Sequence, residues 1–413
     1  MKGKGKHLVP GMLLVLFMPD VTLADPLRTT RLSEIISVLE KGVVCDGVTD
    51  DAPALRSLFK SVSNSTIVFP SGKNCLLGTT VAPGYPASDN AAVLISRQAN
   101  FHIIATGTTF TTSNAIPLSQ AILIDRGTHW TWDGGVFVGS RVGLAPLQEN
   151  VGIGLFNNVD FRVSGVEFKW GYGGAGAPFC GDWNVDGTIN DIVMNGVGIG
   201  FDTAFSKNLI INNIHATGAD TNGASGTGQV GTKFFSNIYD TPSASVNYTG
   251  YMFTDTDGVT LKNSDFSNFE TGVALASGAH FRFIHNNSHD NPGQNSAKGI
   301  GYYIYYNNGG VATSIGHPVK DVVIDGGIIA NNGGAIPGYG VVVVASTIRN
   351  SDVIDGILIQ NSIFDNNKAT AIGADSAVGI NHFVVRMNTY KGVNQITTLD
   401  SNTVKILKTT AGK

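Results

Sequence analysis

The chain is poor in cysteine, in charge and in long apolar runs, and each shortage excludes a class of protein. Three cysteines, Cys45, Cys75 and Cys180, stand in 413 residues. They are too few for a disulfide-rich scaffold and lack the spacing of a zinc site. In an oxidising compartment Cys45 and Cys75 could pair and leave Cys180 free. Charged residues make up 14% of the chain, against about 25% in ordinary globular proteins.

Two kinds of partner are excluded as well. The formal net charge is −4 and no basic run follows the first residues, so we expect no nucleic-acid partner. No segment reaches the roughly 20 apolar residues of a membrane-spanning helix. Beyond residue 65 there is no long stripe of apolar residues at helical spacing, which argues against a helical fold.

The N-terminus has the layout of a secretory signal peptide. A lysine-rich start precedes the mostly apolar run Leu8–Met18, and small residues stand at Thr22-Leu-Ala24, where a signal peptidase would cut. We predict a signal peptide over residues 1–24 and a single domain over residues 25–413. This places the protein in the periplasm or outside the cell.

The chain is rich in glycine, with 52 residues, and it contains a repeated sequence motif. In each copy apolar residues alternate with others, and Asn, Gly, Ser or Asp follows. Alternation is the period of a β-strand, and Asn and Gly favour tight turns. The copies are Phe101–Phe110, Asp160–Phe168, Asn208–His215, Gly258–Asp265, His280–Asn287, Asp321–Ile328 and Gly356–Phe364.

The spacing of these copies predicts a solenoid. The starts at 208, 258, 280, 321 and 356 fit a coil of roughly 20–25 residues with loop insertions of variable length. An antiparallel sandwich or barrel would also give many short strands. The recurrent Asn corner argues against the sandwich or barrel and favours an all-β, parallel β-helix, in which each coil packs on its neighbours.

The N-terminal part of the domain is expected to cap this solenoid. Arg31–Glu40 has helical spacing, and Ala52–Lys60 is expected to form a short amphipathic helix with Asp50 or Asp51 as N-cap and Pro53 in its first turn. Such a helix would cover the unpaired edge of the first coil.

Residues 42–72 resemble a known family. The sequence Gly42-Val-Val-Cys-Asp-Gly-Val-Thr-Asp-Asp51, the helix, and Val68-Phe-Pro-Ser-Gly72 are similar to the opening of the pectate-lyase-like superfamily, which includes rhamnogalacturonases, polygalacturonases and phage tailspikes. The family usually has glycine at the position of Cys45. The resemblance implies a right-handed parallel β-helix that acts on polysaccharide, but hydrolases, lyases, epimerases and binders all share this opening. We expect the acidic residues of this motif to cap structure rather than to catalyse.

Aligning the coils brings candidate catalytic residues together. If Asn208 matches Gly258, then His215 matches Asp265 and Asp220 matches Glu270. Pro292 falls at the same height in the next coil, close to His289 and Asp290. Matching residues of adjacent coils lie about 4.8 Å apart, and glycosidases need such a pair of carboxyl groups. We therefore predict Asp220 and Glu270 as the catalytic pair of a hydrolase, with Asp202 tuning them and His289 nearby.

Asp202 has a weaker resemblance of its own. Gly200-Phe-Asp-Thr203 and Ala219-Asp220 are loosely similar to the aspartate motifs of polygalacturonases, but that family's Gly-His-Gly and Arg-Ile-Lys motifs are missing. Ala204 also stands where the Asp-Pro-His motif of alginate epimerases needs histidine. In a lyase, Asp202, Asp220 and Glu270 would instead gather calcium, and the base would be Lys233, Lys298 or Arg282.

Two irregular stretches are expected to contact the substrate or a metal. In residues 170–193, Asp182 and Asp186 flank Asn184 at a spacing that suits calcium, although Val193 stands where an EF-hand needs glutamate. The second stretch is residues 221–250. The aromatic residues that we predict to bind sugar rings are Trp170, Tyr172, Trp183, Tyr239 and Tyr302.

The sequence thus predicts a secreted carbohydrate-active enzyme, a pectate-lyase-like lyase or a glycoside hydrolase, which cleaves an extracellular polysaccharide. The only cofactor it suggests is Ca2+. The alternatives are a non-catalytic glycan-binding or adhesive β-helix and a polysaccharide epimerase. A homotrimer, as in tailspikes, stays open.

Overall fold

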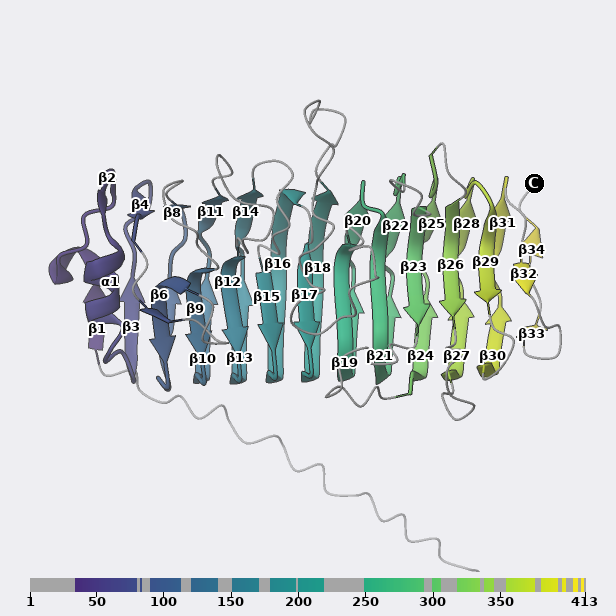
Figure 1. Ribbon diagram of the computed structural model, residues 1–413, viewed down its shortest axis with the longest axis horizontal. Helices are drawn as coiled ribbons and strands as arrows, with labels where there is room; N and C mark the ends of the chain where they lie inside the picture. The colour runs from purple at the N-terminus through teal and green to yellow at the C-terminus, as the bar shows by residue number, and fades with distance from the viewer. Residues whose placement is uncertain are drawn as a thin grey trace, which may run out of the picture. The chain divides into compact units, whose positions relative to one another are not determined.

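The structure is a computed structural model that describes residues 34–79, 82–83, 90–112, 120–139, 151–170, 179–197, 200–218, 249–292, 299–305, 318–334, 338–344, 354–375, 380–392, 396–398, 404–407 and 410–411. Within the unit from Leu32 to Lys413, the described residues form one sheet of 34 strands wound into successive coils (Figure 1). Its strand pairs are parallel except for β5 (Ala82–Pro83) with β6 (Asn90–Ser96). The predicted parallel β-helix is therefore confirmed.

Each coil turns three corners, so the strands form three faces. Face 1 consists of β6, β9 (Gln120–Asp125), β12 (Val151–Phe156), β15 (Phe179–Asp182), β17 (Phe201–Ala204), the first halves of β19 (Thr249–Lys262) and β21 (Thr271–Ile284), β23 (Gly299–Tyr305), β26 (Gly338–Val344), β29 (Thr370–Asp375) and β32 (Ile396–Thr398).

Face 2 follows face 1 in each coil. It consists of β1 (Glu34–Ser37), β3 (Ser65–Val68), β7 (His102–Ile104), β10 (Thr128–Asp133), β13 (Val159–Ser164), the first halves of β16 (Val185–Val197) and β18 (Lys207–Gly218), the second halves of β19 and β21, β24 (Lys320–Asp325), β27 (Ile354–Gln360), β30 (Ile380–Arg386) and β33 (Val404–Leu407).

Face 3 closes the coil. It consists of β2 (Asp46–Asp50), β4 (Asn74–Leu77), β8 (Thr109–Thr112), β11 (Val136–Gly139), β14 (Glu167–Trp170), the second halves of β16 and β18, β20 (Asp265–Ser267), β22 (Asn287–His289), β25 (Ile328–Ala330), β28 (Ile363–Asp365), β31 (Thr389–Lys391) and β34 (Thr410–Ala411).

The register agrees with the alignment made from the sequence. Ile211 pairs with Leu261, and His215 pairs with Asp265. Because side chains alternate along a strand, one correct match fixes which residues of two coils face inward.

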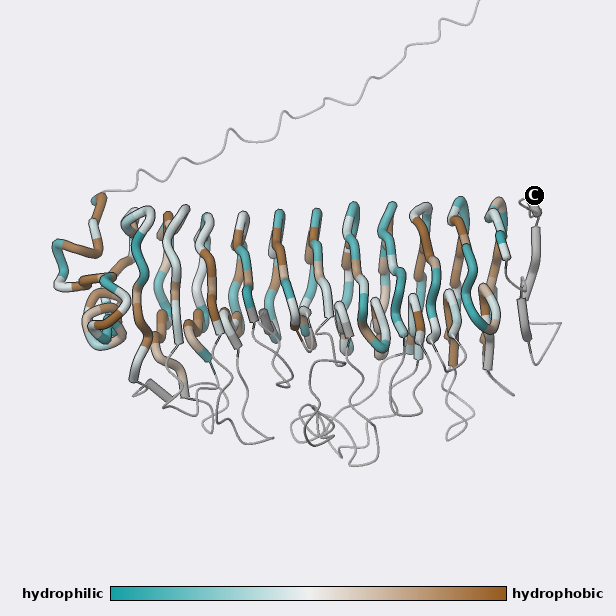
Figure 2. The backbone as a smooth tube through the Cα atoms, turned by 90° about the horizontal axis from the view of Figure 1, so that it is seen from above, coloured by the Kyte–Doolittle hydropathy of each residue, from teal (hydrophilic) through white to brown (hydrophobic). Residues whose placement is uncertain are grey.

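The core is a column of apolar side chains that runs from coil to coil. The rings of Phe101, Trp130 and Phe161 stack with centroid separations of 5.6 and 5.2 Å. These separations follow from the coil spacing of about 4.8 Å, since like positions of successive coils stand over one another. Hydrophobic residues accordingly recur in coil after coil (Figure 2).

The corner between faces 2 and 3 is tight. From β19 onward two residues separate the strands, and the second often points inward and hydrogen-bonds to the next coil. Asn286 is buried, accepts the N–H of Ser264 at 3.0 Å and donates to the carbonyl of Leu261 at 2.9 Å. The preceding residue, His285, has φ 53°, in the left-handed region that turns the chain sharply.

The N-terminal cap departs in part from expectation. The expected helix over Arg31–Glu40 is wrong for the described residues 34–40. These form strand β1, which pairs with β3, and the start of the 3-10 helix η1 (Val38–Lys41). Pairing with the first coil outweighs the helical spacing, a tertiary override of local propensity. The short helix α1 (Ala52–Leu58) is confirmed, with proline in its first turn, and stands at one end of the solenoid (Figure 1).

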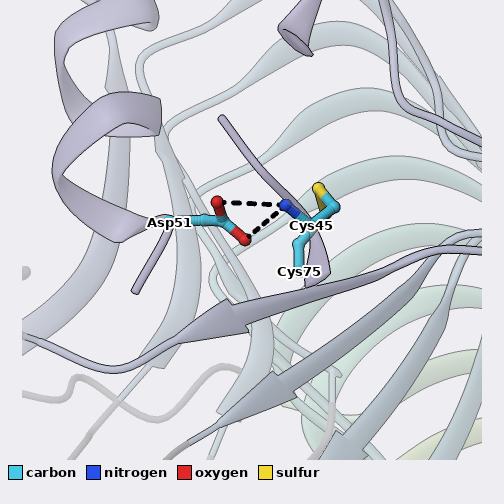
Figure 3. A group of neighbouring side chains, drawn as sticks. All are labelled: Cys45, Asp51 and Cys75. Atoms are coloured by element: carbon cyan, nitrogen blue, oxygen red, sulfur yellow. Dashed lines mark hydrogen bonds between the residues drawn. A yellow bond between two sulfur atoms is a disulfide. The ribbon is translucent and has the colours of Figure 1, made fainter. Parts of the chain in front are cut away.

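The acidic residues of the cap serve structure, as expected. Asp51 is buried and accepts the backbone N–H of Val44 at 2.7 Å. It also accepts the backbone N–H of Cys45 at 3.1 Å (Figure 3). Asp50 rather than Asp51 caps α1 with its side chain, by accepting the N–H of Ala52 at 3.1 Å. Cys45 and Cys75 form a buried disulfide. Cys45 has φ 50°, a conformation in which glycine is least strained, which explains why glycine is usual there.

Candidate functional site

The connections from face 3 to face 1 differ greatly in length. Between β18 and β19 this connection includes residues 219–248, whereas between β28 and β29 it is residues 366–369. Long connections on a rigid scaffold commonly carry function. The side chains that matter most are therefore those on the outer side of face 1 and at this corner.

Two buried carboxyl groups lie on the outer side of face 1. In the register of β15 and β17, Cys180 pairs with Asp202, and Asp182 pairs with Ala204. Asp182 and Asp202 are therefore on adjacent coils, two residues apart, and face the same way. Their exposures are 5% and 7%. We call Asp182 and Asp202 the acidic pair.

The strands hold this pair firmly. Phe201 and Thr203 point inward on β17: the ring of Phe201 stacks on Tyr251 at 4.4 Å, and Thr203 donates to the carbonyl of Gly181 at 2.6 Å. Asp182 itself accepts the backbone N–H of Ala204 at 3.0 Å. The alternation of β17 thus directs Asp202 outward on a strand anchored on its inner side.

Of the two carboxyl groups, that of Asp182 has a pKa near neutrality. Burial raises the pKa of Asp182 to about 7, against a smaller opposing effect of the Ala204 N–H. Burial, and then the charge of Asp202, raise the pKa of Tyr251. A carboxyl group that holds its proton near pH 7 beside a second carboxyl group can deliver a proton to a substrate.

Asp182 and Asp186 are not brought together as a metal site. Asp182 is buried on face 1, whereas Asp186 is exposed on face 2 and accepts the side-chain N–H of Asn208 at 2.9 Å. Asn184 lies inside the corner between them and donates to the carbonyl of Leu155 at 2.8 Å. The predicted calcium pair is thus corrected: the chain turns a corner within this motif, so its side chains diverge.

In the described part of the chain, one group has three metal-capable side chains close together. It consists of Cys45, Asp51 and Cys75, and the two sulfurs are joined in the disulfide. This group therefore serves the structure of the cap.

Glu270 is also buried, with 4% exposure, but lies apart from Asp202. Asp202 pairs with Met252, and Met252 pairs with Ala274, four residues beyond Glu270. Two coil spacings and four residues along a strand separate the two Cα atoms by roughly 16 Å. Glu270 therefore cannot share a proton with Asp202. Its predicted partner Asp220 lies outside the described residues.

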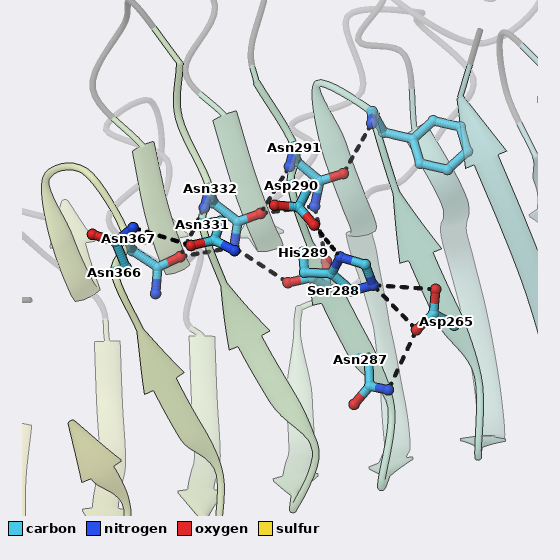
Figure 4. A network of polar contacts seen from close by, with 11 residues as sticks. Asp265, Asn287, Ser288, His289, Asp290, Asn291, Asn331, Asn332, Asn366 and Asn367 are labelled. Atoms are coloured by element: carbon cyan, nitrogen blue, oxygen red, sulfur yellow. Dashed lines mark hydrogen bonds and ion pairs between the residues drawn. The ribbon is translucent and has the colours of Figure 1, made fainter. Parts of the chain in front are cut away.

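His289 lies in a polar cluster on the outer side of face 3 (Figure 4). Its Nε2 is 3.2 Å from Asp265, and its Nδ1 is 2.6 Å from Asp290. The hydrogen bond to Asp265 is the largest of the effects that raise the pKa of His289 to about 9, and the same contact lowers the pKa of Asp265. His289 is therefore a cation at neutral pH with both ring nitrogens engaged, so it is not available as a base. In the sequence, Asp265 is marked only by its match to His215, and no motif signals its contact with His289.

A ladder of buried asparagines supports this cluster from inside. Asn291 donates to Asn332 at 2.8 Å, and Asn332 donates to Asn367 at 2.8 Å (Figure 4). Asn291 also accepts the N–H of Phe269 at 2.9 Å. The ladder fixes the corner that follows His289.

The two aromatic residues predicted to bind sugar whose side chains are described, Trp183 and Tyr302, differ in their exposure. Trp183 is half-buried and stacks on Phe205 with a centroid distance of 5.3 Å. Tyr302 is 1% exposed and packs in the core against Phe283. Its assignment to substrate binding is therefore corrected: the alternation of β23 turns Tyr303 and Tyr305 outward instead.

Among the candidate bases of a lyase, the structure describes the side chain of Arg282. Arg282 lies on face 2 and donates to the carboxylate of Asp321 at 2.6 Å, so it cannot reach the acidic pair. The predicted site residues Tyr172, Asp220, Lys233, Tyr239 and Lys298 lie outside the described residues. For Trp170 the structure describes only the backbone, in strand β14. The described helices include none with the length and apolar character to cross a membrane.

The sequence matches no protein-family model and no curated protein. Solved structures resemble it more clearly. A tailspike variant of E. coli bacteriophage HK620, in complex with a pentasaccharide, aligns with a TM-score of 0.64 and 11% identity over 92% of this chain and 67% of that chain. The surface adhesin PfbA of Streptococcus pneumoniae aligns with a TM-score of 0.60 and 11% identity over 91% and 92%.

The A-module of the Azotobacter vinelandii mannuronan C-5 epimerase AlgE6 aligns with a TM-score of 0.51 and 13% identity over 91% of this chain and 99% of that chain. At such identities the likeness establishes the fold. The chain has a right-handed parallel β-helix fold, as its opening motif implied.

Proposed function

We propose that this protein binds and hydrolyses an extracellular polysaccharide at the acidic pair. The observation that carries the proposal is a buried carboxyl group, Asp182, with a pKa of about 7, one coil away from a second carboxyl group, Asp202. Glycoside hydrolysis needs one carboxyl group to hold a proton and one to be ionised.

In the proposed reaction water adds across the glycosidic C–O bond. Asp182 gives its proton to the leaving oxygen, and ionised Asp202 accepts a proton from the water whose oxygen bonds to the anomeric carbon. Burial supports the role of Asp182, because it raises the pKa of this carboxyl group to about 7, so the group still holds a proton near neutral pH.

The location outside the cytoplasm is part of the proposal. It is supported by the signal-peptide layout of residues 1–24 and by the buried disulfide between Cys45 and Cys75, a bond that oxidising compartments maintain. Among the structural relatives, the tailspike variant is a complex with a pentasaccharide and the epimerase is named for mannuronan.

The test is a screen of the mature chain, residues 25–413, on acidic and neutral polysaccharides. New reducing ends and absorbance at roughly 235 nm, where unsaturated uronates absorb, are recorded together, with and without chelator. Reducing ends without absorbance support hydrolysis. Reducing ends with absorbance would replace the hydrolase by a lyase, and chelator sensitivity would then require a metal.

A non-catalytic glycan-binding protein is the second candidate, and one observation favours it. The Asp182 carboxyl group already accepts the Ala204 N–H and is 5% exposed, as a purely structural residue would be. Binding to a polysaccharide without cleavage, in both wild type and Asp182→Asn, would select this reading.

A further inference from the structure

One inward position of face 1 departs from the apolar composition of the core, and it does so beside the acidic pair. The strand register repeats this position once in each strand of face 1 from β6 to β26. We call its occupants the inward column: Ile95, Ile124, Leu155, Gly181, Thr203, Phe253, Leu275, Ile304 and Val343. All are buried apolar side chains except Gly181 and Thr203. These two residues adjoin Asp182 and Asp202 in the chain.

The hydroxyl group of Thr203 is not explained by packing. Thr203 is 1% exposed, and burying a hydroxyl group costs free energy unless a hydrogen bond compensates for its lost hydration. Valine has nearly the same shape as threonine and would bury no polar atom at this position. Residues that break a local rule of core composition are expected at functional sites.

The hydroxyl group links β17 to β15, the neighbouring strand of the acidic pair. It donates to the carbonyl of Gly181 at 2.6 Å, and its oxygen lies 3.1 Å from the hydroxyl oxygen of Ser206. Glycine is required at position 181, because a Cβ atom there would lie 2.8 Å from the side-chain nitrogen of Asn184 and 3.2 Å from the carbonyl oxygen of Leu155. A glycine in a strand commonly marks such a close approach.

The next residue of β17 makes a second link to the same segment. The backbone N–H of Ala204 donates to the carboxyl group of Asp182 at 3.0 Å. Thr203 and Ala204 thus hold Gly181 and Asp182, their partners in the register. Because Asp202 directly precedes Thr203 in β17, a shift of β17 against β15 would move the two carboxyl groups relative to each other.

We propose that Thr203 is the positioning residue of the acidic pair, and that its hydroxyl group holds β17 on β15 so that Asp182 and Asp202 keep one relative placement. Because Thr203 is buried on the inner side of the sheet, it acts through the two aspartates and does not touch the substrate. The reaction that this placement serves rests on the proposed function. The placement itself can be measured without a substrate.

The experiment compares Thr203→Val, which keeps the shape and removes the hydroxyl group, with Thr203→Ser, which keeps the hydroxyl group. The matched control is Thr108→Val, in coils that do not carry the acidic pair. Thr108 is also buried, with 0% exposure, and donates to the carbonyl of Pro70 at 3.0 Å. In the mature chain, residues 25–413, the titration of Asp182 is followed by carbon-13 NMR of labelled aspartate carboxyl groups, and Asp182→Asn assigns its signal. Urea unfolding gives the stability of each variant.

If Thr203→Val does not fold, Thr203→Ala takes its place, because it also lacks the hydroxyl group. The outcomes that support or overturn the inference are the same for both variants.

We expect the Asp182 titration of Thr203→Val to move to higher pH, because the Ala204 N–H, which lowers the pKa of Asp182, is no longer held in place. Thr203→Ser and Thr108→Val should titrate as wild type does. On the substrate found in the screen, Thr203→Val should lower kcat at least about tenfold with KM unchanged, since a misplaced proton-transfer group slows the chemical step. An Asp182 titration that stays the same or moves to lower pH in Thr203→Val overturns the inference, because Thr203 would then serve only the core.

Failure of the proposed function would look different. If Asp182→Asn and Asp202→Asn leave cleavage unchanged, or if no substrate is cleaved, the acidic pair is not catalytic. The effect of Thr203→Val on the titration of Asp182 would then persist, because it is measured without substrate.

Discussion

The two corners that flank face 3 follow opposite rules. At the corner between faces 2 and 3 of the later coils, two residues suffice, one in a left-handed conformation and one, such as Asn286, bonded to the neighbouring coil. At the corner between faces 3 and 1, the connection ranges from residues 366–369 to residues 219–248. Stability and variation are therefore assigned to different edges of the same coil, as is usual when function is grafted on a rigid scaffold.

The largest expected effect is on the reaction at face 1. Asp182→Asn and Asp202→Asn should each lower kcat by at least about a hundredfold, since each removes a proton-transfer group. Reducing-end release on the substrate found in the screen is the measurement, and His289→Gln is the matched control because it lies outside the pair. A loss of activity with His289→Gln alone would move the reaction to face 3.

The next effect is the pH dependence of stability at Asp182. Its folded pKa of about 7 exceeds the ordinary 3.8, so between these values the folded chain holds more protons than the unfolded chain. Stability therefore falls as pH rises from about 4 to 7, by up to about 4 kcal/mol. Asp182→Asn should remove this fall. Urea unfolding at pH 4 and pH 8 tests it, and an unchanged pH dependence in the variant would disprove it.

The tight corner offers a smaller but sharper test. Asn286→Ala should destabilise the protein by about 2–3 kcal/mol, since the Ser264 N–H and the Leu261 carbonyl lose a buried partner. The adjacent exposed residue gives the control: His285→Gly keeps the left-handed conformation and should change stability by less than about 1 kcal/mol. Chemical denaturation measures the free energy of unfolding of both variants. Equal losses of this free energy would mean that the backbone conformation, and not the inward hydrogen bonds of Asn286, stabilises this corner.

The smallest expected effect is at His289. Its pKa of about 9 lies above the ordinary 6.5, so the charged side chain contributes stability that is complete below about pH 6.5 and is lost as pH rises through 9. Because its side chain is 30% exposed, screening reduces this contribution to about 1–2 kcal/mol. Thermal unfolding at pH 6.5 and pH 10 measures it, with His289→Gln as the variant that should lose the dependence.

The winding of the chain into coils can be recognised from the amino-acid sequence alone. The alternation and the Asn and Gly corners predicted parallel strands, and aligning Asn208 with Gly258 predicted that His215 meets Asp265, which the register confirms. The capping helix was also predictable from Asp50 and Pro53. These features are local, or repeat at a fixed spacing, and so can be recognised without knowledge of distant contacts.

Which candidate residues share a site depends instead on contacts between coils that no local pattern shows. The corner at Trp183 sends Asp182 and Asp186 to different faces, and the alternation of β23 buries Tyr302 while Tyr303 and Tyr305 face outward. Asp182 meets Asp202 because the connection between their strands returns the chain in a particular register. Burial and proximity between coils arise only when the chain is wound, and these two properties set the pKa of Asp182.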